Sequence, residues 1–231
     1  MVTVTINNKE VEVEEGSTIL QAAKLAGIDI PTLCFLKDIN EIGDCRMCVV
    51  EVEGQRGFAT SCIQKVREGM VIKTNTPKLI EARRMVLDLI LSNHDRECLT
   101  CTRNGTCELQ KLAQEFYVDD IRYKGERNHF EIDDKSPAIV RDFNKCILCR
   151  RCVSTCKLVQ GIGAIDCTER GFASKISTFE DKSLNDVNCT NCGQCILACP
   201  TGALHEKENI NDVWTKLKDP DTYVIAQTAP A

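Results

Sequence analysis

Two copies of one cysteine spacing constrain this chain more than any other feature of its sequence. The pattern C-x2-C-x2-C-x3-C occurs first between residues 146 and 156 and again between residues 189 and 199. Closely spaced thiolates are soft ligands that select zinc, copper(I) or iron–sulfur centres. A duplicated set of this kind predicts an internal repeat that folds around two inorganic centres instead of one large hydrophobic core.

The composition supports several small metal-organised units. The chain has 231 residues, of which sixteen are cysteines, and aromatic residues make up only 5%. Such a chain is poor material for one large core, whereas small units gain stability from inorganic centres. The N-terminus has no basic region followed by an apolar run, so we expect no secretion signal. Without export, cysteines are expected to be metal ligands and not disulfides.

Charge and motif content narrow the function classes. A net charge of −5 argues against nucleic acid as a partner. No apolar stretch reaches the length of about 18 residues that a membrane helix needs. The sequence also lacks a P-loop, a G-x-S-x-G motif and a paired-carboxylate motif. We therefore expect a cytoplasmic protein whose 231 residues contain no acid–base or nucleophilic site.

Residues 1–78 form the first predicted unit. Alternating apolar residues predict two strands with a turn between them. A capping residue, a helix and a terminating glycine are expected after the second strand. These expectations are strands at 2–6 and 11–13, a turn at Asn7-Asn8, a cap at Ser17, a helix over 18–26 and its end at Gly27. The strand–strand–helix start resembles the β-grasp fold of plant-type ferredoxins.

The cysteines of this first unit predict a 2Fe–2S centre. Their spacing is C-x10-C-x2-C-x13-C, at Cys34, Cys45, Cys48 and Cys62. The alternative is a zinc ribbon, but ribbons pair two C-x2-C knuckles and this segment has one. Plant-type ferredoxins have a shorter first gap. The longer gap here is similar to that of complex I and of iron hydrogenases.

Residues 79–125 predict a small helical unit. Thr76-Pro77 is a cap followed by a favoured first-turn residue, and a second helix is expected from a cap at Thr106 to Tyr117. The apolar positions that predict the face of the first helix are Leu79, Ala82, Val86 and Leu89.

A histidine and three cysteines follow the first of these helices, and their spacing is H-x3-C-x2-C-x5-C. The residues are His94, Cys98, Cys101 and Cys107. A cubane cluster needs four ligands and only three cysteines are present, which favours His94 as the fourth. This spacing resembles the segment shared by complex I, NAD-linked formate dehydrogenases and iron hydrogenases, which implies a 4Fe–4S cluster. A zinc site with the same four ligands is the alternative.

Residues 126–209 carry the duplicated cysteine run, and they resemble the two-cluster ferredoxins of bacteria. Pro200 follows the second run as in those proteins, whereas Lys157 replaces the proline after the first. In that family three cysteines of each run bind one 4Fe–4S cluster and the fourth crosses to the other. The resemblance therefore implies one ligand set of Cys146, Cys149, Cys152 and Cys199, and a second of Cys189, Cys192, Cys195 and Cys156. Cys167 is left over, and it is expected to be a small half-buried residue. His129 and His205 are expected to have no role as ligands.

The order of the units resembles the accessory region of iron-only hydrogenases of the multimeric, NAD-linked type. NAD-linked formate dehydrogenases share the order. Residues 210–231 are similar to the stretch that leads into the hydrogenase catalytic domain, with a helix over 211–217 and a strand over 223–226 expected in it.

This resemblance implies an α+β chain that relays electrons through one 2Fe–2S and three 4Fe–4S clusters. The implied partners are flavin- and NAD-binding subunits, a small 2Fe–2S subunit and a soluble ferredoxin. The chain itself is expected to conduct without catalysis, while its parent subunit would be a hydrogenase. The alternatives are the relay arm of a formate dehydrogenase and a stand-alone electron carrier.

Overall fold

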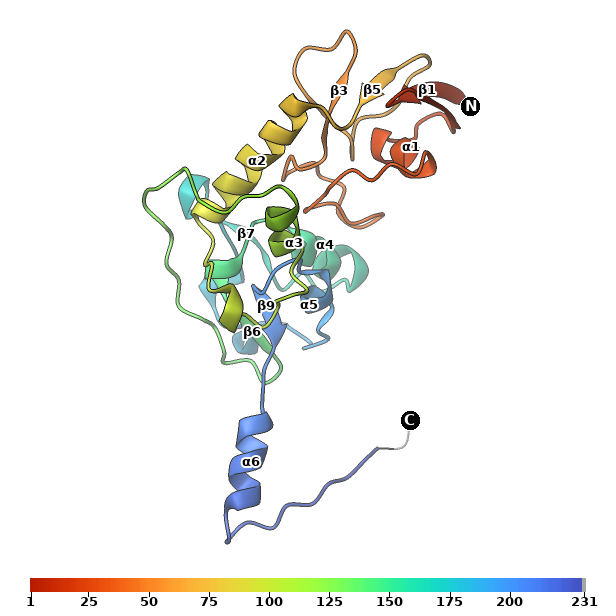
Figure 1. The fold of residues 1–231 in the computed structure, drawn as a ribbon. Helices are drawn as coiled ribbons and strands as arrows, with labels where there is room; N and C mark the ends of the chain where they lie inside the picture. The colour runs from red at the N-terminus through yellow and green to blue at the C-terminus, as the bar shows by residue number, and fades with distance from the viewer. Residues whose placement is uncertain (230–231) are drawn as a thin grey trace.

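The computed structural model describes residues 1–229, and these form two bodies joined by one long helix. A five-stranded sheet with one helix makes the first body (Figure 1). Helix α2 (Pro77–Ser92) runs from that sheet to the second body, which holds short helices and two-stranded sheets. The last two residues of the expected 210–231 connector lie outside the described part of the chain.

The sheet of the first body has the strand order β2-β1-β5-β3-β4. Strands β1 and β5 are parallel, and the other neighbours are antiparallel. Their bounds are β1 Val2–Ile6, β2 Lys9–Val13, β3 Val49–Val52, β4 Ala59–Thr60 and β5 Val71–Lys73. The predicted hairpin is confirmed: Asn7 and Asn8 both have positive φ, as a two-residue turn matched to strand twist requires.

Helix α1 (Ile19–Leu25) covers one face of this sheet and closes the first core. Its N-cap is Thr18, whereas the sequence predicted Ser17. Thr18 takes this position because Gln21 stands three residues after it, and the two residues form a reciprocal capping box. The buried core joins Ala22 and Ala23 of the helix to Ile6 and Ile72 of the sheet.

Helix α2 begins as predicted, with the Thr76 side chain accepting a hydrogen bond from the Leu79 amide and Pro77 in the first turn. The predicted apolar face is wrong at its far end, because Leu89 is 51% exposed. The buried stripe instead runs through Leu79, Arg83, Leu87, Asp88 and Leu91. A stripe that contains Arg and Asp cannot be found from apolar spacing alone.

Helix α3 (Glu108–Glu115) packs against α2 and is shorter than predicted. Its N-cap is Cys107, whose sulfur accepts the Gln110 amide, and not Thr106. The helix ends before Tyr117, which adopts a left-handed φ of 52°. The second core joins Leu109 and Leu112 of α3 to Leu87 and Leu91 of α2.

The second body is built from two ribbons and two short helices. Its elements are β6 Ile139–Arg141 paired with β9 Leu204–Glu206, β7 Asp166–Thr168 paired with β8 Lys175–Ser177, α4 Arg151–Ser154 and α5 Gln194–Ala198. Helix α4 continues as one wider turn over Thr155–Val159. Short 3-10 turns lie at Cys98–Thr100, Phe143–Lys145, Gly171–Ala173, Phe179–Asp181 and Leu184–Asp186.

Helix α6 (Ile210–Lys218) projects away from the second body, and the chain after it turns at the far end of the helix and runs back beside it, apart from both bodies in this view (Figure 1). The helix agrees with the expectation for residues 211–217. The strand expected over 223–226 is not formed, because no neighbouring strand within residues 1–229 pairs with it. Among the described residues, no helix combines the length and the apolar character that crossing a membrane would require.

Candidate metal centres

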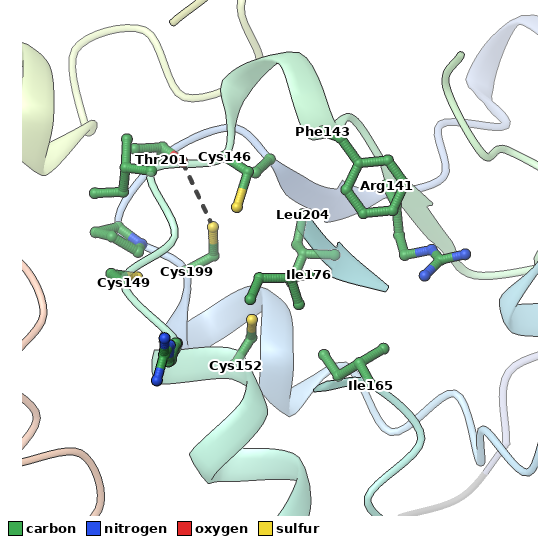
Figure 2. Close-up of a pocket in the computed structure, with 14 residues that line it drawn as sticks. Arg141, Phe143, Cys146, Cys149, Cys152, Ile165, Ile176, Cys199, Thr201 and Leu204 are labelled. Atoms are coloured by element: carbon green, nitrogen blue, oxygen red, sulfur yellow. Dashed lines mark hydrogen bonds between the residues drawn. The ribbon is translucent and has the colours of Figure 1, made fainter. Parts of the chain in front are cut away.

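One cavity of the second body is lined by Cys146, Cys149, Cys152 and Cys199 (Figure 2). The first three come from the loop before α4 and its first turn, and the fourth comes from the end of α5. Apolar side chains such as Ile165, Ile176 and Leu204 close the cavity opposite the sulfurs. The structure therefore brings three cysteines of one run together with the last cysteine of the other.

A second cavity repeats this arrangement with the roles of the two runs exchanged. It is lined by Cys189, Cys192 and Cys195 of the second run together with Cys156 of the first. Both cavities have a volume of about 30 Å³. Exchanged donors of this kind are the arrangement expected of an internal repeat.

The backbone repeats the same pattern at each run. The Leu148 amide donates to the Cys146 sulfur, and the Asn191 amide donates to the Cys189 sulfur, both at an N···S distance of 3.4 Å. Both donors have positive φ, and so do Arg150 and Gly193, the residues that precede α4 and α5. Left-handed non-glycine residues cost free energy and persist only where the surroundings impose them. Here they turn amides toward sulfur, as anion-binding nests do.

Burial sets the chemistry of these thiols. Burial raises the pKa of Cys146, Cys149 and Cys195 to about 12, and neighbouring thiolates add to the effect. Buried thiolates without a counter-charge are costly, so such a set needs cations among its sulfurs to lose its protons. A group of iron ions supplies that charge, and the all-cysteine donor set fits it.

The first body holds the other all-cysteine set, in the loops beside β3 and β4. The Cys45 amide donates to the Cys34 sulfur at 3.4 Å, and the Cys34 amide donates to the Cys45 sulfur at 3.3 Å. The sulfurs of Cys48 and Cys62 lie 3.3 Å apart. The structure thus brings together the four cysteines expected in this unit, as two sulfur pairs.

Hydrogen bonding within each pair favours the thiolate at one cysteine and opposes it at the other, since it raises the pKa of Cys34 and of Cys62. The side chain of Cys34 lowers the pKa of Cys45 to about 6, and that of Cys62 lowers the pKa of Cys48 to about 7. Thiolates are the form that binds metal. Arg83 of α2 reaches the segment next to Cys48, where its guanidinium donates to the Met47 and Val49 carbonyls, and it also donates to the Thr74 carbonyl after β5.

The third group lies between α2 and α3. His94 follows the end of α2, Cys98 and Cys101 bracket a 3-10 turn, and Cys107 caps α3. His94 is 7% exposed, and its Nδ1 atom has no hydrogen-bond partner within the described part of the chain. Burial lowers the pKa of His94 to about 4, so the ring is neutral at neutral pH and carries a lone pair for a metal.

Gly202 forms a cradle for this third group. A Cβ atom at Gly202 would lie 2.6 Å from the Cys101 sulfur, closer than any van der Waals contact allows. The Cys101 sulfur can therefore occupy its place only because residue 202 has no side chain. An orphaned imidazole nitrogen and a sulfur held against bare backbone both fit a cluster bound among these side chains.

Single-ion sites are a poor fit to these groups. Within residues 1–229, no three His, Cys, Asp or Glu side chains lie close enough to bind one metal ion. Zinc needs four donors on one tetrahedron, at about 2.3 Å for each sulfur. The cysteines of the two runs instead surround shared cavities, as the donors of a polynuclear group do.

The remaining candidates line neither cavity of the second body. Cys167 is half-buried on β7, as predicted, and none of the sixteen cysteines is in a disulfide. His205 lies on β9 with its Nδ1 atom 3.3 Å from the Gly202 carbonyl, and His129 lies in the segment before β6. Sequence reasoning missed Asn40, Arg103 and Gly202, which contact the cysteine loops from distant positions. No local pattern marks such contacts.

The fold and its four cysteine-rich groups define an iron–sulfur electron-transfer protein. Three family descriptions match it: "2Fe-2S iron-sulfur cluster binding domain" over residues 1–77, "NADH-ubiquinone oxidoreductase-G iron-sulfur binding region" over 83–122, and "NADH-quinone oxidoreductase subunit 3, ferredoxin-like domain" over 136–205. The chain belongs to the family of iron–sulfur regions shared by NADH-quinone oxidoreductases and NAD-reducing hydrogenase-type subunits.

Individual relatives agree with this placement. The chain is 48% identical to the NADP-reducing hydrogenase subunit HndD of Solidesulfovibrio fructosivorans over its whole length, which is 40% of that protein. It is 37% identical over 90% of its length to the NADH-ubiquinone oxidoreductase 75 kDa subunit of Reclinomonas americana, covering 30% of it. A chain in the crystal structure of an NAD+-reducing [NiFe]-hydrogenase in the H2-reduced state matches with a TM-score of 0.83 and 30% identity, covering 89% of this chain and 87% of that one. The chain thus spans less than half the length of the two curated relatives.

Proposed function

We propose that this chain is an electron relay that carries one 2Fe–2S and three 4Fe–4S clusters. The 2Fe–2S ligands are Cys34, Cys45, Cys48 and Cys62, and the ligands of the first cubane are His94, Cys98, Cys101 and Cys107. The other cubanes take Cys146, Cys149, Cys152 and Cys199, and Cys189, Cys192, Cys195 and Cys156. Units at 1–78, 79–125 and 126–209, with a connector at 210–231, are the domains proposed with them.

The exchanged donors of the two cavities carry this proposal. Cys199 lies with the first run and Cys156 with the second, as the ligand exchange of two-cluster ferredoxins requires. Iron–sulfur clusters supply one-electron centres whose potentials depend on charge, hydrogen bonds and burial. The chain's own residues hold the centres at fixed positions, point amides at their sulfurs and keep water away.

The contacts between the groups indicate an order for the relay. The set that contains Cys199 lies at the middle of the chain's cysteine groups. Cys45 of the first body is close enough for its charge to raise the pKa of Cys149, and Cys195 of the last set is close enough to raise that of Cys152. On a third side, the Arg103 guanidinium donates to the Cys199 carbonyl, next to the Gly202 cradle of Cys101. The proposed relay therefore branches at the middle set.

The larger protein that this relay serves is proposed to be an iron-only hydrogenase of the NAD(P)-linked type. The 48% identity to a subunit named as an NADP-reducing hydrogenase supports this assignment. The proposed partners are flavin- and NAD-binding subunits, a small 2Fe–2S subunit and a soluble ferredoxin. A relay arm in a complex I-like oxidoreductase is the second candidate, which the match of residues 83–122 and 136–205 favours.

Cysteine exchange between the runs can be tested by single substitutions. In anaerobically prepared protein, Cys199→Ala should perturb the same electron paramagnetic resonance signal as Cys152→Ala. Cys156→Ala and Cys192→Ala should each perturb the signal of the other cubane, although Cys156 belongs to the first run.

Cys167→Ala is the matched control, because Cys167 lies on β7 and belongs to none of the four sets. Its iron content and all its signals should equal those of the wild type. Signals that group Cys156 with Cys152 would show that each run binds its own cluster. Loss of iron in the control would show that the ligand sets are wrongly drawn.

A further inference from the structure

The two bodies meet at a junction that joins the loop over residues 34–45 to the first cysteine run. Ile147, between Cys146 and Cys149, packs into the same core as Leu33 and Met47. At the rim of the junction, the Arg150 guanidinium lies 3.6 Å from the Asp44 carboxylate. Two loops that both hold cysteine ligands of the proposed relay thus lie directly against each other.

One side chain spans the middle of this junction. Asn40 is 1% exposed, and its Nδ2 atom donates to the Cys34 carbonyl at 2.7 Å and to the Cys149 carbonyl at 3.0 Å. Its Oδ1 atom accepts a hydrogen bond of 2.6 Å from the Ser154 hydroxyl on α4. Every polar atom of the carboxamide therefore has a partner, and the two carbonyls belong to residues 115 positions apart in the sequence.

The loop itself holds Asn40 in place. The backbone amide of Asn40 donates to the backbone carbonyl of Leu36 at 2.7 Å, and the backbone amide of Leu36 donates to the backbone carbonyl of Asn40 at 3.1 Å. Asp38 lies between them with a left-handed φ of 62°. Because this turn satisfies the backbone groups of Asn40, its side-chain amide is free to bind groups of the second body. A buried amide needs such partners, because an unpaired one would cost free energy.

We propose that Asn40 is the positioning residue that couples the 2Fe–2S centre to the cubane held by Cys149, by bridging the carbonyls of one ligand from each. This inference rests on the proposed function and specifies how electrons cross between the bodies. One electron would pass between a centre held by Cys34 and a centre held by Cys149, oxidising the donor centre and reducing the acceptor centre. No bond forms or breaks, and no proton moves. Tunnelling falls steeply with distance, so a hydrogen-bonded amide favours this crossing over a looser contact.

Asn40→Asp tests the proposal with almost no change in volume. The substitution replaces the amide donor by an oxygen that faces two carbonyl oxygens, so the junction should open. In fully reduced protein, the magnetic interaction between the 2Fe–2S and cubane spins should weaken. After photochemical injection of one electron, transfer between the two centres should become several-fold slower. Asn128→Asp is the matched control, because the Asn128 side-chain amide donates to the Phe172 carbonyl and to no cysteine residue.

Iron content and the separate spectra of the two centres show whether each variant is fully loaded. If Asn40→Asp loses a cluster, Ser154→Ala decides, because losing the hydroxyl that orients the Asn40 carboxamide should loosen its contacts with both carbonyls. Slower transfer in this variant supports the proposal. Unchanged spin interaction and transfer rate in a loaded Asn40→Asp, or in Ser154→Ala if the first variant loses a cluster, would overturn it. Wild-type protein without either signal would instead refute the proposed clusters.

Discussion

Gly202 is the residue at which the smallest change has the most specific expected effect. Gly202→Ala would place a methyl group 2.6 Å from the Cys101 sulfur. The atom that this methyl group would displace is the sulfur of a proposed ligand, so we expect loss of the cluster proposed for His94 and its three cysteines. Iron content should then fall by about four atoms per chain. Metal analysis measures this loss. Gly125→Ala is the control, and its iron content should equal that of the wild type, because no atom lies within 4 Å of a Cβ built at Gly125.

His94 should set the potential of its cluster through charge. A neutral imidazole leaves the cluster one negative charge poorer than a thiolate would, which makes reduction easier, as in Rieske centres. His94→Cys should keep the cluster and lower its potential by more than about 59 mV, a tenfold change in the one-electron equilibrium. Spectroscopically monitored redox titration measures this shift. An unchanged potential in His94→Cys, with an intact cluster in His94→Ala, would leave His94 without a role as ligand.

Helix α2 is anchored to the first body by a buried cation. Arg83 is 3% exposed and donates to three carbonyls on two segments of the chain, a geometry that suits the planar fork of a guanidinium. Arg83→Lys cannot reach all three acceptors, and we expect the free energy of unfolding to fall by about 1–3 kcal/mol. Thermal or denaturant unfolding measures this loss. Arg84→Lys is the control, since exposed Arg84 makes one bond to the Tyr117 carbonyl, and a loss of equal size there would contradict the account.

Strand β6 is tied to the segment before it by the pair of Arg141 and Asp133, whose charged atoms lie 2.7 Å apart. Burial alone would raise the pKa of Asp133, but hydrogen bonds from Ser183 and Arg141 outweigh it and hold that pKa below its usual range. The pair therefore contributes stability above about pH 4, and the contribution is lost as the pH falls through the lowered pKa.

Asp133→Asn should accordingly cost about 2 kcal/mol of unfolding free energy near neutral pH. The difference from wild type should shrink as the pH falls from about 4 through the lowered pKa, because the protonated Asp133 carboxyl is then uncharged, like the amide of Asn. Unfolding measured at a series of pH values gives both quantities. A difference that grows toward acid pH would have the wrong sign for this ion pair.

Short-range signals account for the elements that the sequence predicted well. Asn7-Asn8, Thr76-Pro77 and the helix near residues 211–217 each depend on neighbours within a few positions. The errors lie where long-range packing decides. Leu89 is exposed because α2 turns Arg83 and Asp88 inward, toward partners that no local pattern reveals.

At the scale of the whole molecule, cysteine spacing predicted which thiols would gather, but not how the groups would touch. The family match confirms a 2Fe–2S unit and ferredoxin-like units in a mixed α/β chain. The individual ligands and the number of cubanes stay predictions. The contacts of Asn40 and Gly202 join segments more than a hundred residues apart, and spacing within a run carries no information about them.

The inventory of clusters tests the account most directly. Four complete ligand sets require about 14 iron atoms and 14 acid-labile sulfides per chain in anaerobically prepared protein, from one 2Fe–2S and three 4Fe–4S centres. Iron, zinc and sulfide analysis of one sample, with resonance signals from both cluster types, measures this inventory. The account predicts about 14 of each with little zinc. Stoichiometric zinc with little iron would contradict it.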